Sequence, residues 1–145
     1  MKRIYTIGFT GKTAEEFFTK LEVAGVKRIL DIRLKNSSQL SGFAKKDDLK
    51  YFLLRINGIQ YLHLTKLAPT EDILDSYKKK KIGWSEYEIK FGKLLAERRV
   101  ENLMRNELVG GDCFLCSEEK PEHCHRRLVS EYLQNKLGDI TIIHL

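Results

Sequence analysis

The chain passes from a predicted strand to a predicted helix within the segment Cys116-Ser-Glu-Glu-Lys-Pro-Glu-His-Cys-His-Arg-Arg127. The apolar run before it, Cys113–Cys116, has the length and composition of a buried strand. After it, apolar side chains recur at helical intervals as far as Leu137, and Gly138 ends the pattern. This strand-to-helix step indicates an α/β fold, in which such junctions are common places for ligands.

The same step recurs along the whole chain. The predicted strands are Arg3–Ile7, Arg28–Ile32, Gln60–Leu64, Cys113–Cys116 and Ile140–Leu145. The predicted helices run from the Thr13 cap to Gly25 and then over Lys45–Asn57, Glu86–Arg105 and Glu122–Leu137. The alternation predicts a single three-layer α/β/α domain over residues 1–145, with a mainly parallel, five-stranded, Rossmann-like sheet.

Composition and charge limit which kinds of protein this chain can be and which partners it favours. The chain has 145 residues, of which 42% are hydrophobic, and only two are prolines, as expected of one folded domain. No run approaches the ~18 consecutive apolar residues of a membrane span. Three cysteines cannot all pair within one chain, so we expect reduced thiols, a cytoplasmic location and no membrane partner. The net charge of +6 favours an anionic small molecule or nucleic acid as partner.

Polar and reactive residues gather where the predicted strands end. The carboxyl ends of parallel strands meet at one edge of a sheet, which is the usual ligand crevice. The residues placed there are Gly8, Phe9, Thr10, Asp31, Arg33, His63, Cys116, Glu118, Cys124, His125 and Arg126.

The cysteines divide into two kinds. Cys113 and Cys116 are three apart on a strand and therefore point to opposite faces, so we interpret Cys113 as a small buried hydrophobic residue. Cys124 falls in the first turn of a helix, where backbone N–H groups, the helix dipole and Arg126 favour a thiolate with a lowered pKa. The alternative, that Cys124 is a core residue on the same apolar stripe as Leu128, is equally compatible with the sequence.

Three further segments carry weaker signals. Asp31 and Arg33 lie on the same face of their strand, where Arg33 either grips an anion or forms an ordinary salt bridge. The long connection Leu34–Ala44 has the features of a lid. The basic run Tyr77–Lys81, followed by Trp84, is either a nucleic-acid contact or a solvated helix end.

Several of these motifs resemble the DUF488 family of uncharacterised proteins. They are Thr6-Ile-Gly8, Asp31-Ile-Arg33, Tyr61-Leu-His-Leu64, Cys116-x-Glu118 and Pro121-Glu-His-Cys-His-Arg-Arg127. The family's first turn usually reads Thr-Ile-Gly-His/Tyr-Ser, whereas this chain has Phe9 and Thr10 there. Because the family has no established activity, the resemblance supports the site and implies no reaction.

The leading hypothesis is an enzyme that binds a phosphate-bearing substrate, such as a nucleotide or a nucleic-acid component. Arg33 and Arg126 would hold the anion, helped by Asp31 and by the turn that contains Gly8 and Thr10.

The catalytic residues of this hypothesis come from the quoted segment. Cys124 would be the nucleophile or redox thiol and Cys116 its partner, with Glu118 or His125 as the proton carrier.

Two other classes stay open. A zinc or iron module would use Cys116, Cys124 and His125, with His123 or Glu118 as a fourth ligand. A non-catalytic nucleic-acid binder would instead use the lysine run 78–81. The sequence names no cofactor and no oligomeric state.

Overall fold

The computed structural model of the chain describes residues 1–36 and 42–145. The strands are β1 (Lys2–Gly8), β2 (Arg28–Asp31), β3 (Gln60–His63), β4 (Asp112–Cys116) and β5 (Ile140–His144). The helices are α1 (Ala14–Ala24), α2 (Lys46–Phe52), α3 (Glu71–Lys78), α4 (Trp84–Arg98), α5 (Val100–Met104) and α6 (His125–Leu137). The predicted lid over Leu34–Ala44 falls in part on residues 37–41, which lie outside the described residues.

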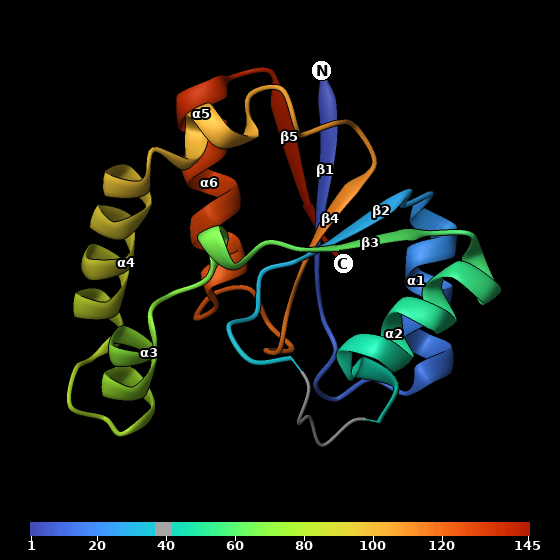
Figure 1. Cartoon of the computed structure of the whole chain (residues 1–145), viewed down its shortest axis with the longest axis horizontal. Coiled ribbons are helices and arrows are strands. Elements are labelled where there is room, and N and C mark those ends of the chain that lie inside the picture. The colour runs from blue at the N-terminus through green and yellow to red at the C-terminus, as the bar shows by residue number, and fades with distance from the viewer. Residues whose placement is uncertain (37–41) are drawn as a thin grey trace.

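The five strands form one sheet in the order β3-β2-β4-β1-β5, and every neighbouring pair is parallel. Helices α1 and α2 lie on one side of the sheet and α3 to α6 on the other, as Figure 1 shows. The predicted three-layer α/β architecture with a parallel five-stranded sheet is therefore confirmed. In the described part of the chain, no helix combines the length and the apolar character that a membrane crossing requires.

Each face of the sheet has its own apolar core, because successive strand residues point to opposite sides. On the side of α1 and α2, Phe17 and Leu21 pack against Ile7, Cys113 and Leu115.

On the other side, residues of α4 and α6 pack against alternate strand positions. Phe91 and Val129 contact Ile4, Leu30 and Phe114 there. The two clusters confirm that Cys113 is a buried hydrophobic residue and that it faces away from the side on which α6 lies.

The helix starts and breaks follow local chemistry. Thr13 caps α1 through a capping box with Glu16, as the sequence predicts. The predicted helix Glu86–Arg105 is broken at Arg99, whose φ of 51° is left-handed and turns α5 away from the axis of α4. The last helix begins at His125 rather than Glu122, so Cys124 is its N-cap residue.

The strand order opens a gap at the carboxyl ends of β2 and β4. These neighbours are followed by connections that leave toward opposite faces, through α2 and α6 respectively. The space between two such strand ends is the usual position of a ligand in an open parallel sheet.

Candidate functional site

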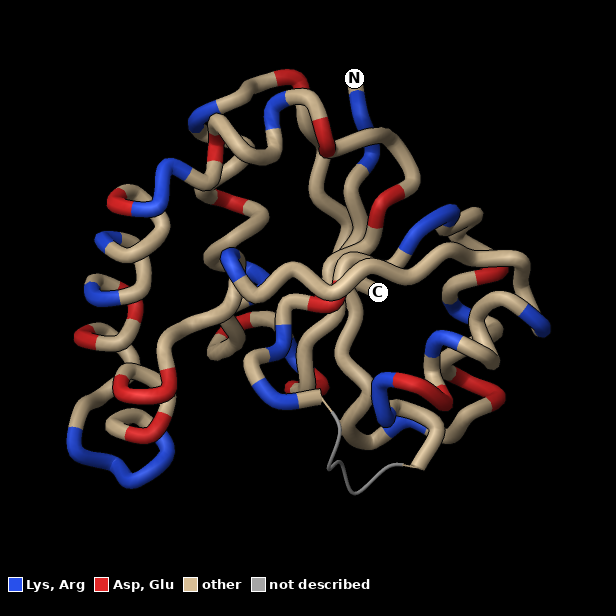
Figure 2. The backbone as a smooth tube through the Cα atoms, in the orientation of Figure 1, with Lys and Arg blue, Asp and Glu red and all other residues tan. Residues whose placement is uncertain are grey.

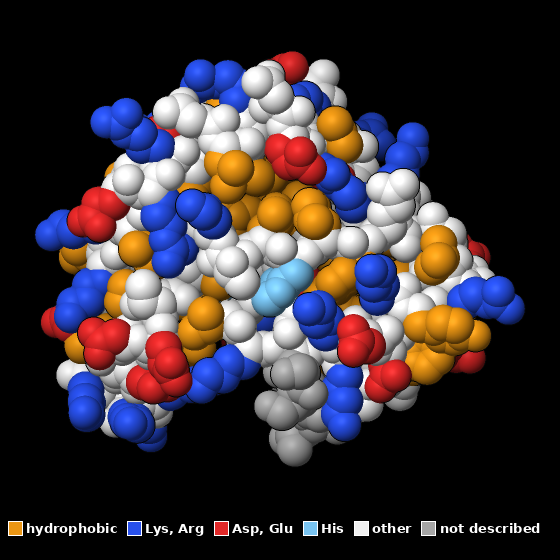
Figure 3. Space-filling view, in the orientation of Figure 1, with side chains coloured by type: hydrophobic (Ala, Val, Ile, Leu, Met, Phe, Trp, Pro, Cys, Tyr) orange, Lys and Arg blue, Asp and Glu red, His pale blue; other side chains and the backbone are white. Residues whose placement is uncertain are grey.

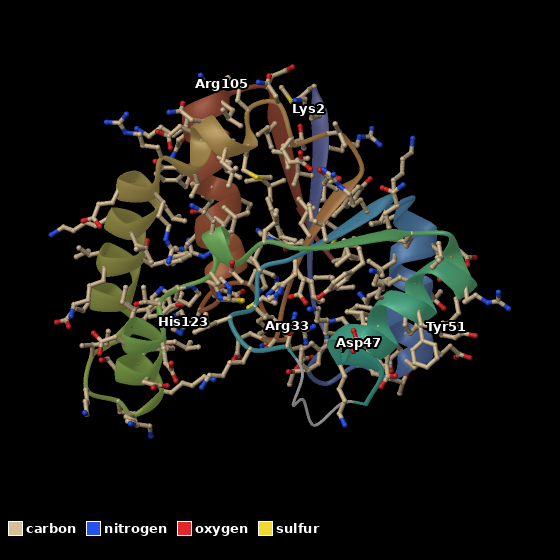
Figure 4. All side chains as sticks on the ribbon, viewed as in Figure 1. Lys2, Arg33, Asp47, Tyr51, Arg105 and His123 are labelled. Carbon is tan, nitrogen blue, oxygen red and sulfur yellow. The ribbon has the colours of Figure 1, made fainter. Side chains whose placement is uncertain are left out.

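A pocket of about 320 Å³ occupies this gap. Its lining residues come from the end of β2, from α3 and α4, and from the loop between β4 and α6. They are Arg33, Leu34, Lys35, Leu74, Tyr77, Lys78, Trp84, Tyr87, Cys116, Ser117, Glu118, His123, Cys124 and His125. Figure 3 shows Lys and Arg side chains at the lower left of the molecule, where Figure 1 places α3. Figure 4 places Arg33 and His123 at the end of the sheet opposite Lys2 and Arg105.

His125 connects the end of β4 to the end of β2. Its Nε2 lies 2.7 Å from the carbonyl oxygen of Ile32, and its Nδ1 lies 3.2 Å from Sγ of Cys116. A carbonyl oxygen only accepts hydrogen bonds, so Nε2 carries a proton and Nδ1 is the atom that faces the thiol. When Cys116 is a thiolate, protonated Nδ1 donates to its sulfur; when Cys116 is a thiol, Nδ1 accepts its proton.

The pKa is lowered for the thiol of Cys116 and raised for the thiol of Cys124. Burial alone would raise the pKa of Cys116, but hydrogen bonds from Cys124 and from the backbone N–H groups of Ser117 and Glu118 outweigh it and lower that pKa. The pKa of Cys124 is raised, first because its thiol donates to Cys116 and then because it is buried. The predicted lowered pKa of Cys124 is therefore wrong, since the loop after β4 directs its amides at the other sulfur.

Arg33 has one donor group without a partner. Its Nε and Nη2 bind the two carboxylate oxygens of Asp31 at 2.9 Å, which confirms that the two residues share a face. The guanidinium lies 5.3 Å from the ring centre of Phe9, and the side chain is 2% exposed. Nη1 is buried with no hydrogen-bond partner among the described residues. A buried unpaired N–H is costly, so this atom is a ready donor for the oxygen of an anion.

A hydrogen-bond network that the sequence reasoning missed holds Asp31 in place. The Tyr61 hydroxyl donates to Oδ2 of Asp31 at 2.5 Å, and Nδ2 of Asn36 donates to the same atom at 3.2 Å. Burial raises the pKa of Asp31, but the bonds from Arg33 and Tyr61 outweigh it and lower that pKa overall. Nε2 of His63 lies 2.8 Å from the carbonyl oxygen of Arg33, as expected of a satisfied histidine.

Arg126 is positioned differently from the prediction. The side chain is fully buried, and its guanidinium donates to Thr6 Oγ1 at 3.2 Å, to the carbonyl oxygen of Glu118 and to that of Glu119 at 3.1 Å. It does not line the pocket. Arg126 therefore holds the loop after β4.

Gly8 and Thr10 hold the same loop. A Cβ at Gly8 would overlap the carbonyl oxygen of Glu118 and come within 2.6 Å of Nη1 of Arg126. The N–H of Thr10 donates to the carbonyl oxygen of Ser117 at 3.1 Å. Both residues thus contact the loop after β4, and their predicted contact with the substrate stays a prediction.

An aromatic wall closes the pocket on the side of α3 and α4. Trp84 stacks on Tyr87 at 5.1 Å and on His123 at 4.9 Å, and the ring centres of Tyr77 and Tyr87 are 4.9 Å apart. The sequence left the basic run here as either a nucleic-acid contact or a solvated helix end, and Figure 2 shows the run of lysines after α3. Only the fold reveals that Trp84 faces the loop between β4 and α6.

The charged residues at the pocket differ in exposure. Glu118 is exposed and lines the pocket, so its predicted role as a proton carrier stays a prediction. Lys35 and Lys78 also line it, and Lys35 pairs with Glu71 at 3.1 Å.

Cys116, Cys124 and His125 could together hold a metal ion. Their ligand atoms lie within 4.8 Å of one another, and all three residues are buried. The bond from Nε2 of His125 to the Ile32 carbonyl resembles the outer contact that orients metal-binding histidines. Among residues 1–36 and 42–145 the group contains these three and no fourth ligand.

Comparison with known proteins gave one match. The family described as "Domain of unknown function DUF488" matches residues 13–133. No curated protein and no solved structure matches the chain.

Proposed function

Because the chain belongs to the DUF488 family, a domain of unknown function, we propose its function from the site itself. The protein is an enzyme that uses the Cys116 thiol as a nucleophile on a phosphate-bearing substrate. One observation carries the proposal: Cys116 Sγ lies 3.2 Å from Nδ1 of His125 in the same pocket as Arg33, whose buried Nη1 has no hydrogen-bond partner in residues 1–36 and 42–145.

The roles of the residues follow from their contacts. Arg33 binds the phosphate through Nη1, and Asp31 keeps its guanidinium in one orientation by bonding Nε and Nη2. Sγ of Cys116 forms a bond to the electrophilic atom of the substrate, and the leaving group takes the proton from Nδ1 of His125. Cys124 donates a hydrogen bond to Cys116 and so stabilises its thiolate before the reaction.

The pocket also favours a substrate with a planar group. Its volume of about 320 Å³ is at the small end of the usual range for ligand sites, about 300–1,000 Å³. The aromatic wall of Tyr77, Trp84 and Tyr87 offers flat apolar surface, and Lys78 adds positive charge. A nucleotide, or a nucleotide unit of a nucleic acid, has both the phosphate and the planar base that such a pocket would accept.

Protection of Cys116 from alkylation tests this proposal. Iodoacetamide modification of each cysteine is followed by peptide mass spectrometry, with and without inorganic phosphate or nucleoside monophosphates. We expect these anions to slow modification of Cys116 in the wild type and to lose that effect in Arg33→Lys, which keeps the charge but lacks the second nitrogen of the fork. Arg55→Lys, at an exposed position outside the pocket, is the matched control. Equal rates with and without every anion would end the proposal.

A metal module is the second candidate, favoured by the spacing of the three ligand atoms within 4.8 Å. Zinc suits two thiolates and an imidazole, and the open side of the pocket would supply a fourth position. Elemental analysis of protein purified without an affinity tag decides the matter. Less than about a tenth of an equivalent of zinc or iron would exclude a tightly bound metal.

A further inference from the structure

We propose that Cys116 and Cys124 form a two-cysteine redox centre that reduces a small hydroperoxide and closes as a disulfide. This activity shares Cys116 with the proposed function but needs neither Arg33 nor a bound phosphate. Its success or failure can therefore be separated from that of the phosphate-dependent reaction.

The two sulfur atoms are already close and have the same neighbour. They lie within 4.8 Å of each other and of a ring nitrogen of His125. Cys116 ends β4, whereas Cys124 precedes the first residue of α6. Residues 117–124 between them form bends and turns without a strand or helix. A small adjustment of this loop brings the sulfur atoms to bonding distance without moving either regular element.

The reactive thiol is open to a small molecule from the pocket. Cys116 and Cys124 are 4% and 2% exposed, but both line the pocket, whose volume far exceeds that of a peroxide. Nδ1 of His125 lies 3.2 Å from Sγ of Cys116 and is the atom that takes the proton of that thiol. An accessible cysteine beside a second cysteine is the usual redox-sensitive kind.

In the first step, the Cys116 thiolate attacks one peroxide oxygen and the O–O bond breaks. Sulfur is oxidised to a sulfenic acid, and the hydroperoxide is reduced by the same two electrons. The leaving hydroxide or alkoxide takes the proton from Nδ1 of His125 and departs as water or an alcohol.

In the second step, neutral Nδ1 of His125 takes the proton of the Cys124 thiol. The Cys124 sulfur attacks the Cys116 sulfur, an S–S bond forms, and the S–O bond breaks. The departing hydroxide recovers the proton from His125 and leaves as water. A dithiol reductant then restores both thiols by exchange.

Cys113 serves as an internal control. It is fully buried in the core beside α1 and α2, and burial raises its pKa. On the treatment that oxidises the other two cysteines, it should remain a free thiol.

The experiment treats the reduced full-length protein with hydrogen peroxide and then counts thiols by maleimide labelling under denaturing conditions. Of the three thiols, we expect two to be lost in the wild type, with a single peptide pair, Cys116 joined to Cys124. Cys113→Ser should form the same bond. Cys124→Ser should instead accumulate a sulfenic acid at Cys116, which dimedone traps. Arg55→Lys, at an exposed position outside the pocket, should form the disulfide as the wild type does.

Several results would overturn the redox centre. They are retention of all three thiols, a disulfide that includes Cys113, a bond between two molecules, or a wild type that stops at the sulfenic acid. If Cys116 is protected by phosphate but never forms the disulfide, the redox proposal fails while the proposed function stands. If the disulfide forms but no anion slows alkylation of Cys116, the proposed function fails while the redox proposal stands.

Discussion

Replacement of Gly8 by alanine should strongly destabilise the protein, because this position has no room for a side chain. Gly8 is the last residue of β1 and pairs with Cys116 on β4. The added methyl group would overlap the Glu118 carbonyl oxygen and lie 2.6 Å from Nη1 of Arg126. Both neighbours resist displacement, since one is backbone and the other is a fully buried side chain.

The magnitude follows from two costs. Overpacking a close-packed interior costs about 1–3 kcal/mol. Moving the Glu118 carbonyl also breaks its bond to Arg126, and a hydrogen bond to a charged group contributes about 1.5–3 kcal/mol. The free energy of unfolding should therefore fall by about 2.5–6 kcal/mol in Gly8→Ala. That loss is a large part of the stability of a typical domain, about 5–15 kcal/mol.

Urea unfolding followed by circular dichroism measures the change. Gly92→Ala is the matched control, because Gly92 lies inside α4 and a Cβ there meets nothing within 4 Å. Alanine should stabilise that helix by about 0.5–1 kcal/mol. If Gly8→Ala unfolds within about 1 kcal/mol of the wild type, the loop does not pack on Gly8 as described. The first turn would then have space for a ligand after all.

Four further outcomes are expected. Tyr61→Phe removes a donor to Asp31 and should lower the unfolding free energy by about 1–2 kcal/mol, whereas Tyr51→Phe, at an exposed ring, should leave it unchanged. The pKa of Asp31 is lowered in the folded protein, so its ionised form stabilises the fold above the unfolded value of ~3.9. That stabilisation is lost as pH falls through the folded pKa. Urea midpoints measured between pH 7 and 2 should show the loss, and it should begin at higher pH in Tyr61→Phe. Thr13→Ala removes the capping box of α1 and should cost about 1 kcal/mol by the same assay. Native alkylation should modify Cys116 first, with a midpoint below the ordinary thiol value of ~8.5, and earlier modification of another cysteine would contradict the assignment of the thiolate.

Most of the fold could be predicted because its signals are local. The five strands were predicted within one or two residues of their observed ends, since short β-branched runs bounded by glycine and polar residues are typical of buried parallel strands. The break at Arg99 was missed, because no glycine or proline marks it. Helix α3 was not predicted as a separate element, since its apolar positions are few and none of its residues is fully buried. The Rossmann-like description stays a prediction, as no solved structure matches.

The residues of the site also differ in whether the sequence could predict their positions. Cys116, Cys124 and His125 are close in the chain, and the step from β4 to α6 brings them together, so the sequence pattern alone could place them in one cluster. The pairing of Asp31 with Arg33 was predictable for the same reason, since alternation along an extended chain gives two residues one face.

The sequence by itself thus determined the order of elements, the parallel sheet and the cluster of thiols and imidazole, because periodicity and short spacing act within a few residues. Only the tertiary structure decided which thiol has the lowered pKa, since that depends in part on where the amides of Ser117 and Glu118 point. It also decided that Arg126 is buried in the loop and that Trp84 faces the pocket. Those outcomes depend on packing between distant segments, in which each donor and each apolar surface has many possible partners and the fold selects one.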